Sequence, residues 1–211
     1  PAPISFFSGG FRWVRGGQRS SLLFAKEGER VFSAVLDKHR LVPIGEWMPS
    51  WFGRPLRGLS AVGGLEAGHP SRVVSWSGPT FGAAICYEIS DGYLLANAVS
   101  NGAEFLLSLA NLDPYPIALQ KQFVSLAQLR SIESSRDLVS VSNTGPSIYI
   151  SSSGKITSLV PPFSRGIGLA NVHSQEVITG YIFWREVPLL GLLLLGLFGT
   201  FKSKLRFFRV Q

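Results

Sequence analysis

The sequence contains very few of the residues from which disulfides and metal sites are built. Cys86 is the only cysteine in 211 residues, which excludes an intramolecular disulfide and a multi-cysteine metal site. The three histidines, His39, His69 and His173, lie too far apart in the sequence to show the spacing of metal ligands. A glycine-rich phosphate loop is also absent. We therefore predict neither a metal nor a cofactor.

Charged residues are scarce as well. They make up 16% of the sequence against 45% hydrophobic residues, which is apolar for a soluble domain, so we expect part of the chain to meet lipid. The formal net charge is +7, but more than half of this excess lies in the last ten residues, at Lys202, Lys204, Arg206 and Arg209. Because basic and aromatic residues do not interleave in a surface motif, nucleic acid is not an expected partner.

The beginning of the sequence does not resemble a secretory signal peptide. The first residues, PAPISFFSGGFRW, lack a basic region followed by an apolar core and a small-residue cleavage site. They read as though they begin within a domain, so we expect a fragment or one product of a split gene.

The stretch Phe81–Gly92, FGAAICYEISDG, predicts a buried strand that ends at a reactive side chain. A continuous apolar run followed by turn residues is typical of a strand in a sheet with both faces covered. If the strand continued, Cys86 and Glu88 would face the same side. A lone cysteine is more often a small buried hydrophobe, but a nearby cation would favour its thiolate and make it a nucleophile.

Lys38 is the candidate cation. It follows the apolar run Val31–Leu36, which is expected to pair with Ser21–Ala25 as a β-hairpin. Glu46 lies in the following loop among aromatic residues, where an unpaired charge would be costly. In the simplest interpretation both are ordinary solvated charges, but these surroundings argue against it.

The loop that follows Glu46 is rich in aromatic residues, and Trp47 and Trp51 are candidate substrate-binding residues. An exposed aromatic loop at residues 47–52 is suited to insert at a membrane interface or to cover a lipid pocket. Packing of these rings in the core is the alternative.

Strand and helix patterns alternate through the middle of the sequence, which predicts an α/β layered sandwich. Apolar residues recur at three- and four-residue spacing in the longer helix. The expected helices are Tyr93–Asn101 and Ile117–Asp137, and the expected further strands are Arg72–Trp76, Glu104–Ala110, Leu138–Ser142, Ser147–Ser151 and Ile156–Val160.

The C-terminal part carries an uncharged run, Val187–Phe201, VPLLGLLLLGLFGTF. Fifteen helical residues cover about 22 Å of a hydrocarbon core of roughly 30 Å. With flanking aromatic and lysine side chains added, we expect residues 181–201 to form a transmembrane helix after a domain at 1–180. Residues 202–211 would be a basic cytoplasmic tail and the α/β domain would be periplasmic. A buried core helix is the alternative.

Several segments together resemble the apolipoprotein N-acyltransferases, the membrane-embedded branch of the nitrilase superfamily. They are DKHRLVPIGEW at Asp37–Trp47, AICYEI at Ala84–Ile89, RSIE at Arg130–Glu133, SNTG at Ser142–Gly145 and the C-terminal apolar helix. The resemblance implies a nitrilase-like α-β-β-α sandwich that is incomplete at its N-terminus. It implies a location in the bacterial inner membrane, and it covers only the second half of such an enzyme.

The same resemblance implies a role for each matching residue. Cys86 would attack a phospholipid ester to form a thioester, and Lys38 would favour the thiolate and stabilise the oxyanion. Glu46 and Glu88 would be supporting carboxylates, and Tyr87 the aromatic residue beside the nucleophile. The acyl chain would then pass to the N-terminal amine of a diacylglyceryl-cysteine in a lipoprotein.

This sequence departs from the family in two places. The upstream catalytic glutamate and the earlier membrane helices of the family are not in it, so a separate N-terminal half is a candidate partner. The loop Asn111-Leu112-Asp113-Pro114-Tyr115 replaces the family's usual aromatic pair, which leaves Asn111 and Tyr115 as candidate substrate-binding residues on the acceptor side.

Two other functions stay open at this point. One is a carbon–nitrogen amidohydrolase that uses the same cysteine, against which the apolar C-terminal run and the aromatic loop argue. The other is an inactive membrane-anchored remnant, because a nitrilase-like site without its glutamate is expected to turn over poorly.

Overall fold

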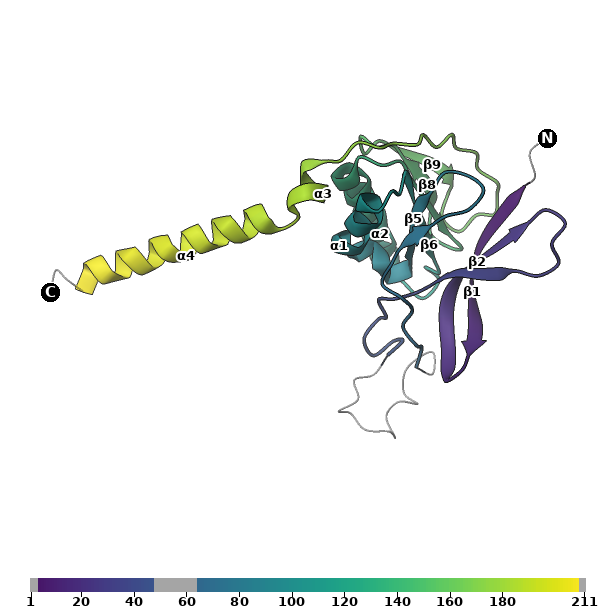
Figure 1. The fold of residues 1–211 in the computed structure, drawn as a ribbon, viewed down its shortest axis with the longest axis horizontal. Coiled ribbons are helices and arrows are strands. Elements are labelled where there is room, and N and C mark those ends of the chain that lie inside the picture. The colour runs from purple at the N-terminus through teal and green to yellow at the C-terminus, as the bar shows by residue number, and fades with distance from the viewer. Residues whose placement is uncertain (1–3, 48–63, 209–211) are drawn as a thin grey trace.

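The described part of the chain forms a layered α/β sandwich (Figure 1). The computed structural model describes residues 4–47 and 64–208, with side chains up to residue 199. Helices cover one face of a six-stranded sheet, and a three-stranded sheet packs against its other face. The layers therefore follow the order helix, sheet, sheet, and the predicted α/β layered sandwich is confirmed.

The six-stranded sheet lies at the centre of the molecule. Its middle strands β5, β6 and β7 run parallel, and the helices α1 and α2 connect them in turn, whereas β4, β8 and β9 pair antiparallel. The sequence patterns predict all of these elements, although α2 ends earlier than expected, β4 is shorter at both ends, and α1, β6 and β8 differ by single residues. The bounds are β4 Val73–Val74, β5 Phe81–Ile85, α1 Gly92–Ser100, β6 Phe105–Ala110, α2 Ile117–Ser134, β7 Leu138–Ser142, β8 Ser147–Ile150 and β9 Ile156–Val160.

The three-stranded sheet consists of β1 (Ser5–Val14), β2 (Gly17–Lys26) and β3 (Ser33–Asp37), all antiparallel. The pairing of β2 with β3 confirms the predicted hairpin. Strand β1 was not predicted, because Gly9-Gly10 interrupts its pattern of alternating apolar residues. At Gly10 of β1 a Cβ atom would lie only 2.7 Å from the Leu23 side chain of β2, so glycine permits these two strands to pack closely there.

The two core clusters explain why β5 is apolar at every position. Phe81, Ala83 and Ile85 belong to the cluster between the two sheets. Ala84 belongs to the cluster beneath the helices, and Gly82 lies against Ala98 of α1. Because successive side chains of a strand point to opposite faces, a strand covered on both sides buries all of them.

Strand β5 ends one residue before the cysteine, and the chain turns sharply there. Cys86 has a φ of +54° and begins a 3-10 helix, η3, at Cys86–Ser90. The condition under which Cys86 and Glu88 would face the same side, a strand that continues past Ile85, is therefore not met. The turn instead directs Glu88 into the interior, where it is 0% exposed.

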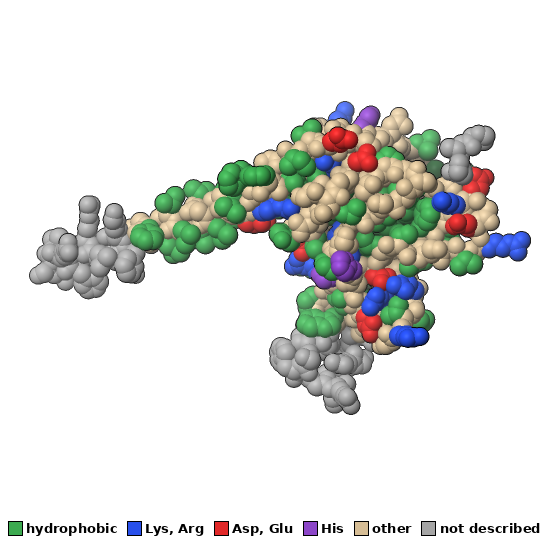
Figure 2. Space-filling view, viewed as in Figure 1, with side chains coloured by type: hydrophobic (Ala, Val, Ile, Leu, Met, Phe, Trp, Pro, Cys, Tyr) green, Lys and Arg blue, Asp and Glu red, His purple; other side chains and the backbone are tan. Residues whose placement is uncertain are grey.

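The expectation of a C-terminal transmembrane helix at residues 181–201 is also wrong. The chain divides there into α3 (Gly180–Trp184) and α4 (Val187–Phe208), because Arg185 adopts a φ of +52° between them. The apolar run that remains in α4 covers only about 22 Å of helix. Within residues 4–47 and 64–208, no helix combines the length and the apolar character that crossing a bilayer requires. Figure 1 shows α4 extending away from the sandwich, and Figure 2 shows hydrophobic side chains along it.

Candidate active site around Cys86

The candidate site lies where β3 and β5 end. Lys38 directly follows β3, and Cys86 directly follows β5. Strands β2 and β5 pack against each other across the two sheets, and the backbone N–H of Lys38 donates to the Ser20 carbonyl of β2 at 2.8 Å. The two candidate residues thus follow strands of different sheets, and the Lys38 ammonium lies near enough to Cys86 to influence the pKa of its thiol.

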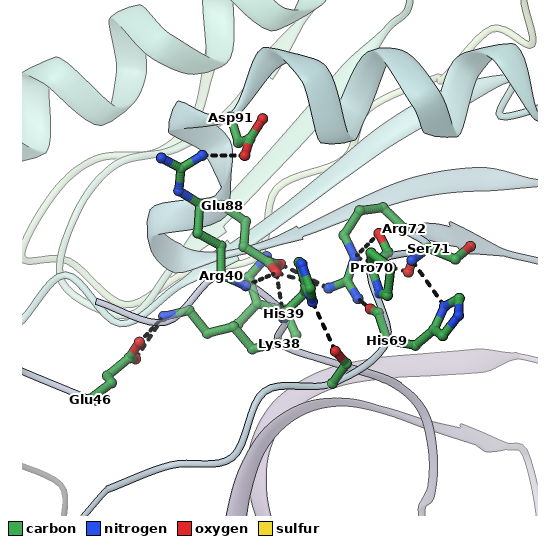
Figure 3. A network of polar contacts seen from close by, with 12 residues as sticks. Lys38, His39, Arg40, Glu46, His69, Pro70, Ser71, Arg72, Glu88 and Asp91 are labelled. Carbon is green, nitrogen blue, oxygen red and sulfur yellow. Dashed lines mark hydrogen bonds and ion pairs between the residues drawn. The ribbon is translucent and has the colours of Figure 1, made fainter. Parts of the chain in front are cut away.

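Lys38 and Glu46 form a close ion pair (Figure 3). The Lys38 Nζ atom donates to both carboxylate oxygens of Glu46, at 2.6 and 2.7 Å, and the Lys38 side chain is 1% exposed. The Val42 N–H also donates to Glu46 Oε2, at 2.8 Å, which fixes the carboxylate in its loop. A buried ammonium is costly without a partner, and Glu46 supplies that partner.

Glu88 is bound by donors from three segments of the chain. Its carboxylate accepts from the backbone N–H groups of His39 at 2.7 Å and Arg40 at 3.1 Å. It also accepts from the Ile85 N–H at 2.9 Å and from Arg72 Nη1 at 2.9 and 3.1 Å. These bonds tie the segment after Lys38 to the strand before Cys86. Figure 3 shows Glu88 with its partners His39, Arg40 and Arg72. Glu88 therefore holds the two candidate residues in register with each other.

The surroundings of Cys86 act on its pKa in opposite directions. Burial is the largest influence and raises the pKa of the thiol, and the Glu46 carboxylate raises it further. The Lys38 ammonium, the Tyr87 N–H and the Tyr115 hydroxyl lower the pKa of the thiol, with Lys38 the strongest of the three. The net pKa lies above the usual value of a cysteine. Lys38, Glu46 and Tyr115 thus all act on one sulfur atom, while that sulfur favours the protonated state.

Tyr115 also acts on the pKa of Cys86. Burial is the main reason that the pKa of Tyr115 is raised to about 12, and the neighbouring Cys86 and Glu46 add to it. Sequence reasoning placed Tyr115 on the acceptor side of the substrate, and the structure brings it near enough to the candidate nucleophile to influence the pKa of its thiol. No local sequence signal predicts this proximity, because the intervening helix and strand have to be placed first.

The other candidate residues lie around this centre. Tyr87 is 36% exposed, and its ring faces the Arg40 guanidinium at 5.7 Å from the ring centroid. Asn111 is exposed, and its side-chain oxygen accepts from Asn143 Nδ2 at 2.7 Å. Trp51 lies outside the described residues.

Trp47 lines a cavity beside the Lys38–Glu46 pair. The cavity has a volume of about 930 Å³, and Arg40, Asp91, His39, Leu41 and Leu94 are among its lining residues. Arg40 and Asp91 form an ion pair in it. Cys86 does not line the cavity, so the cavity adjoins the candidate site without containing the sulfur atom.

Sequence reasoning missed two structural contributors. The first is Arg72, which is 1% exposed and pairs with Glu88. It lies in a glycine-rich stretch that favours a loop, although a buried Glu88 did require a cationic partner. The second is Asn143 of the SNTG segment, whose side chain accepts from the Leu112 N–H at 3.0 Å and so holds the loop that carries Tyr115.

The described residues offer no group of three or more histidine, cysteine, aspartate or glutamate side chains suited to a metal ion. The nearby carboxylates are bound to cations or to N–H groups instead, as the contacts of Glu46 and Glu88 show.

Comparison with solved structures shows the fold. An amidase from Nesterenkonia sp. matches with a TM-score of 0.59 at 17% identity, over 90% of this chain and 66% of the amidase chain. A carbon-nitrogen hydrolase from Helicobacter pylori G27 matches with a TM-score of 0.58 at 11% identity, over 76% of this chain and 60% of that one. The sandwich described above is thus of the nitrilase-like α/β type.

Comparison with sequences identifies the family. An apolipoprotein N-acyltransferase of Prochlorococcus marinus (strain MIT 9313) is 57% identical over 98% of this chain and 41% of its own length. One of Parasynechococcus marenigrum (strain WH8102) is 52% identical over 86% of this chain and 39% of its own length. This chain thus spans about two fifths of the curated relatives that it matches. Residues 18–180 match the carbon-nitrogen hydrolase family model. The chain therefore belongs to the carbon–nitrogen hydrolase family, and within that family it is similar to apolipoprotein N-acyltransferases.

Proposed function

We propose that this chain carries the acyl-transfer centre of an apolipoprotein N-acyltransferase, with Cys86 as the nucleophile. The observation that carries the proposal is the position of Cys86 at a sharp turn after β5, where the charges of the buried Lys38–Glu46 pair influence its pKa. A partly buried thiol beside a fixed cation is the arrangement that a cysteine nucleophile requires. The similarity to the curated relatives supplies the substrate class.

In the first half-reaction the Cys86 thiolate attacks the carbonyl carbon of a phospholipid ester. A carbon–sulfur bond forms, and the carbonyl oxygen takes the negative charge as the tetrahedral intermediate develops. The Lys38 ammonium and the Tyr87 N–H, which both act on Cys86, are positioned to stabilise this oxyanion. Collapse of the intermediate breaks the ester carbon–oxygen bond, and the lysophospholipid leaves as an alcohol after it takes up a proton.

In the second half-reaction the amine of a lipoprotein's diacylglyceryl-cysteine attacks the thioester. A carbon–nitrogen bond forms, the carbon–sulfur bond breaks, and the Cys86 thiolate is regenerated. The ammonium proton of the incoming amine has to pass to a base. Trp47, next to Glu46 on the adjoining cavity, and Asn111, exposed after β6, are proposed substrate contacts.

The thiol proton also needs an acceptor, because burial raises the pKa of Cys86. Both carboxylates of the described site are committed, Glu46 to Lys38 and Glu88 to Arg72 and three N–H groups. We therefore assign the base to a segment outside this sequence, in agreement with the upstream glutamate that the family resemblance implies.

The proposed partners are a phospholipid donor, a lipoprotein acceptor and that separate segment. The predicted periplasmic orientation of the α/β domain depended on a spanning helix, and the described residues give it no support.

The test joins this chain to the part of the Prochlorococcus marinus relative that the chain does not match. The fusion protein is incubated with a phospholipid that carries a labelled acyl chain. We expect label on Cys86 that neutral hydroxylamine removes, as it removes a thioester, and transfer of that label to a lipopeptide amine. Cys86→Ala is the control, and it is expected to carry no label.

A fusion protein that is folded and carries a reactive Cys86, yet takes no label and transfers none, would refute the acyl-transfer proposal. Release of ammonia from small amides without lipid would favour a carbon–nitrogen amidohydrolase instead.

A further inference from the structure

Arg40 brings a cation to the cavity beside the candidate site, and the acyl-transfer steps described above do not use it. Its side chain lines the cavity of about 930 Å³ and is 46% exposed. Cys86 does not line this cavity, but the ring of its neighbour Tyr87 faces the Arg40 guanidinium. The cavity therefore offers a charged binding group next to the candidate nucleophile.

Three contacts hold Arg40 in place. Its backbone N–H donates to Glu88 Oε1 at 3.1 Å. Its Nη1 atom donates to Asp91 Oδ2, and its Cζ atom lies 5.7 Å from the centroid of the Tyr87 ring, within the range of a cation–π interaction. Figure 3 shows the Arg40 side chain extending to Asp91. Because its conformation is already fixed, Arg40 loses little conformational entropy when it binds a ligand.

The Arg40 guanidinium has donors to spare. Every nitrogen atom of a guanidinium carries N–H groups, and among the described residues a hydrogen-bond acceptor is found for Nη1 alone. The Nε and Nη2 atoms are therefore left for a ligand. These two atoms form an edge that binds two oxygens of a phosphate or a carboxylate side by side.

Two carboxylates also line the cavity, but each has a positively charged partner. Asp91 pairs with Arg40, and its Oδ1 atom accepts from the Leu94 N–H at 3.1 Å, at the N-terminus of α1. The partial positive charge of that helix end offsets part of the Asp91 charge. Glu66 Oε2 lies 3.6 Å from Arg19 Nη2. The carboxylates therefore do not exclude an anionic ligand from the cavity.

We propose that Arg40 binds the phosphate of the phospholipid donor, while the ester of the same lipid lies at Cys86. This assignment rests on the proposed acyl transfer, which makes the donor a phospholipid. The glycerol backbone joins the ester to the phosphate through a few bonds, so their binding groups have to be neighbours, as Arg40 and the segment Cys86-Tyr87 are. The cavity volume falls within the range of about 300 to 1,000 Å³ that small-molecule sites occupy, which leaves room for the head group.

The test measures binding to the full chain by isothermal titration calorimetry, so it needs no turnover. The probes are dihexanoylphosphatidic acid, a short-chain phospholipid whose head group is the phosphate alone, and dihexanoylglycerol, which lacks the phosphate. For Arg40→Gln we expect the affinity for dihexanoylphosphatidic acid to fall about 10- to 100-fold, the effect of losing hydrogen bonds to a charged group. The affinity for dihexanoylglycerol is expected to stay the same.

Arg185→Gln is the matched control, because it also removes an arginine that lies over a tyrosine ring. The Arg185 Cζ atom is 5.3 Å from the Tyr93 ring centroid, and Arg185 does not line the cavity. We expect its affinity for both probes to equal that of the unmodified chain. Arg40→Lys keeps the charge but loses the planar donors, so its loss of affinity is expected to be smaller than that of Arg40→Gln. Circular dichroism of each variant checks that it is folded.

Inorganic phosphate is the third probe, and it separates a lipid head group from a free ion. We expect it to bind the unmodified chain more weakly than dihexanoylphosphatidic acid does. Equal affinities would assign the cavity to free phosphate and overturn the lipid assignment.

Three further results would overturn the proposal. They are no binding of dihexanoylphosphatidic acid to the unmodified chain, an unchanged affinity for it in a folded Arg40→Gln, and an equal loss of affinity for dihexanoylglycerol or in Arg185→Gln. Because binding does not require Cys86 to react, a failure of acyl transfer in the fusion protein would leave a positive binding result intact.

Discussion

Lys38 and Glu46 act on the pKa of Cys86 with opposite signs, although they form one ion pair. The Lys38 ammonium lowers the pKa of the thiol and the Glu46 carboxylate raises it. For Lys38→Met we expect the midpoint of Cys86 alkylation to rise by about one pH unit, and for Glu46→Gln we expect it to fall, because each removes a single nearby charge. Alkylation against pH measures both shifts. Lys155→Met, which removes an exposed cation, is the control, and shifts of the same sign in both variants would contradict the expectation.

Glu88 determines stability as well as geometry, because its carboxylate is the partner of a buried guanidinium. In Glu88→Gln the charge that balances Arg72 is lost, and an amide NH₂ faces either the N–H groups of His39 and Arg40, which bind Oε1, or that of Ile85, which binds Oε2. Breaking a buried pair by removing one charge costs about 3 to 5 kcal/mol, so we expect the free energy of unfolding to fall by that amount.

Urea unfolding followed by circular dichroism measures the effect of Glu88→Gln. Glu176→Gln replaces an exposed glutamate and is expected to change the free energy of unfolding by less than about 0.5 kcal/mol. A loss below about 1 kcal/mol in Glu88→Gln would show that the pair contributes little to stability.

At the residue scale, candidate site residues are easier to predict from the sequence than the contacts that those residues make. Lys38, Glu46 and Cys86 are predictable because each stands at the end of an apolar segment or within an aromatic loop. Arg72 and Tyr115 are not, because their partners are distant in sequence and depend on how the two sheets pack and on which strands are parallel.

At the scale of elements, the contact between α1 and the C-terminal segment depends on a glycine. A Cβ atom at Gly92 would lie 1.8 Å from Arg130 Nη1 and 2.7 Å from the Tyr181 hydroxyl. For Gly92→Ala we therefore expect the Arg130 and Tyr181 side chains to be displaced, with a loss of about 1 to 3 kcal/mol in the free energy of unfolding.

Thermal unfolding of Gly92→Ala, compared with Gly191→Ala, measures this effect. Gly191 lies in α4 with nothing within 4 Å of an added Cβ atom, so alanine is expected to be neutral or stabilising by up to about 1 kcal/mol there. An equal change in the free energy of unfolding at the two positions would mean that Arg130 and Tyr181 move aside for the added methyl group without loss of stability.

The regular elements of the main sheet are predictable because each buries a repeating pattern of side chains. The sequence did not predict the two positions where the chain leaves the regular repeat of a strand or a helix. The turn at Cys86 requires a left-handed backbone angle, and the break at Arg185 requires another. Both residues are ordinary L-residues in sequence, so nothing local indicates these angles, and only the surrounding packing imposes them.

At the scale of the whole molecule, the three-stranded sheet presents large apolar side chains to solvent. Phe11 is 56% exposed and Trp13 is 80% exposed, and both lie on β1, which pairs with only one other strand among the described residues. A strand with a free edge and exposed aromatic side chains favours association. We expect the chain to self-associate with rising concentration, and Phe11→Thr combined with Trp13→Thr to weaken this association several-fold.

Sedimentation velocity measures that association. Ile167→Thr with Leu169→Thr is the matched control, because these side chains are 95% and 92% exposed but lie in irregular chain after β9. An equal reduction by the control pair would assign the association to general hydrophobicity and not to β1.

The bonds that Glu88 makes have a consequence for protein engineering. A Cys-Tyr-Glu tripeptide grafted onto another scaffold would bring a thiol and a carboxylate. It would not fix the position of a lysine amine, such as that of Lys38, relative to the sulfur. Glu88 accepts hydrogen bonds from the main chain immediately after Lys38. A graft that reproduces the site therefore has to include both segments, together with Arg72, which neutralises the charge of Glu88.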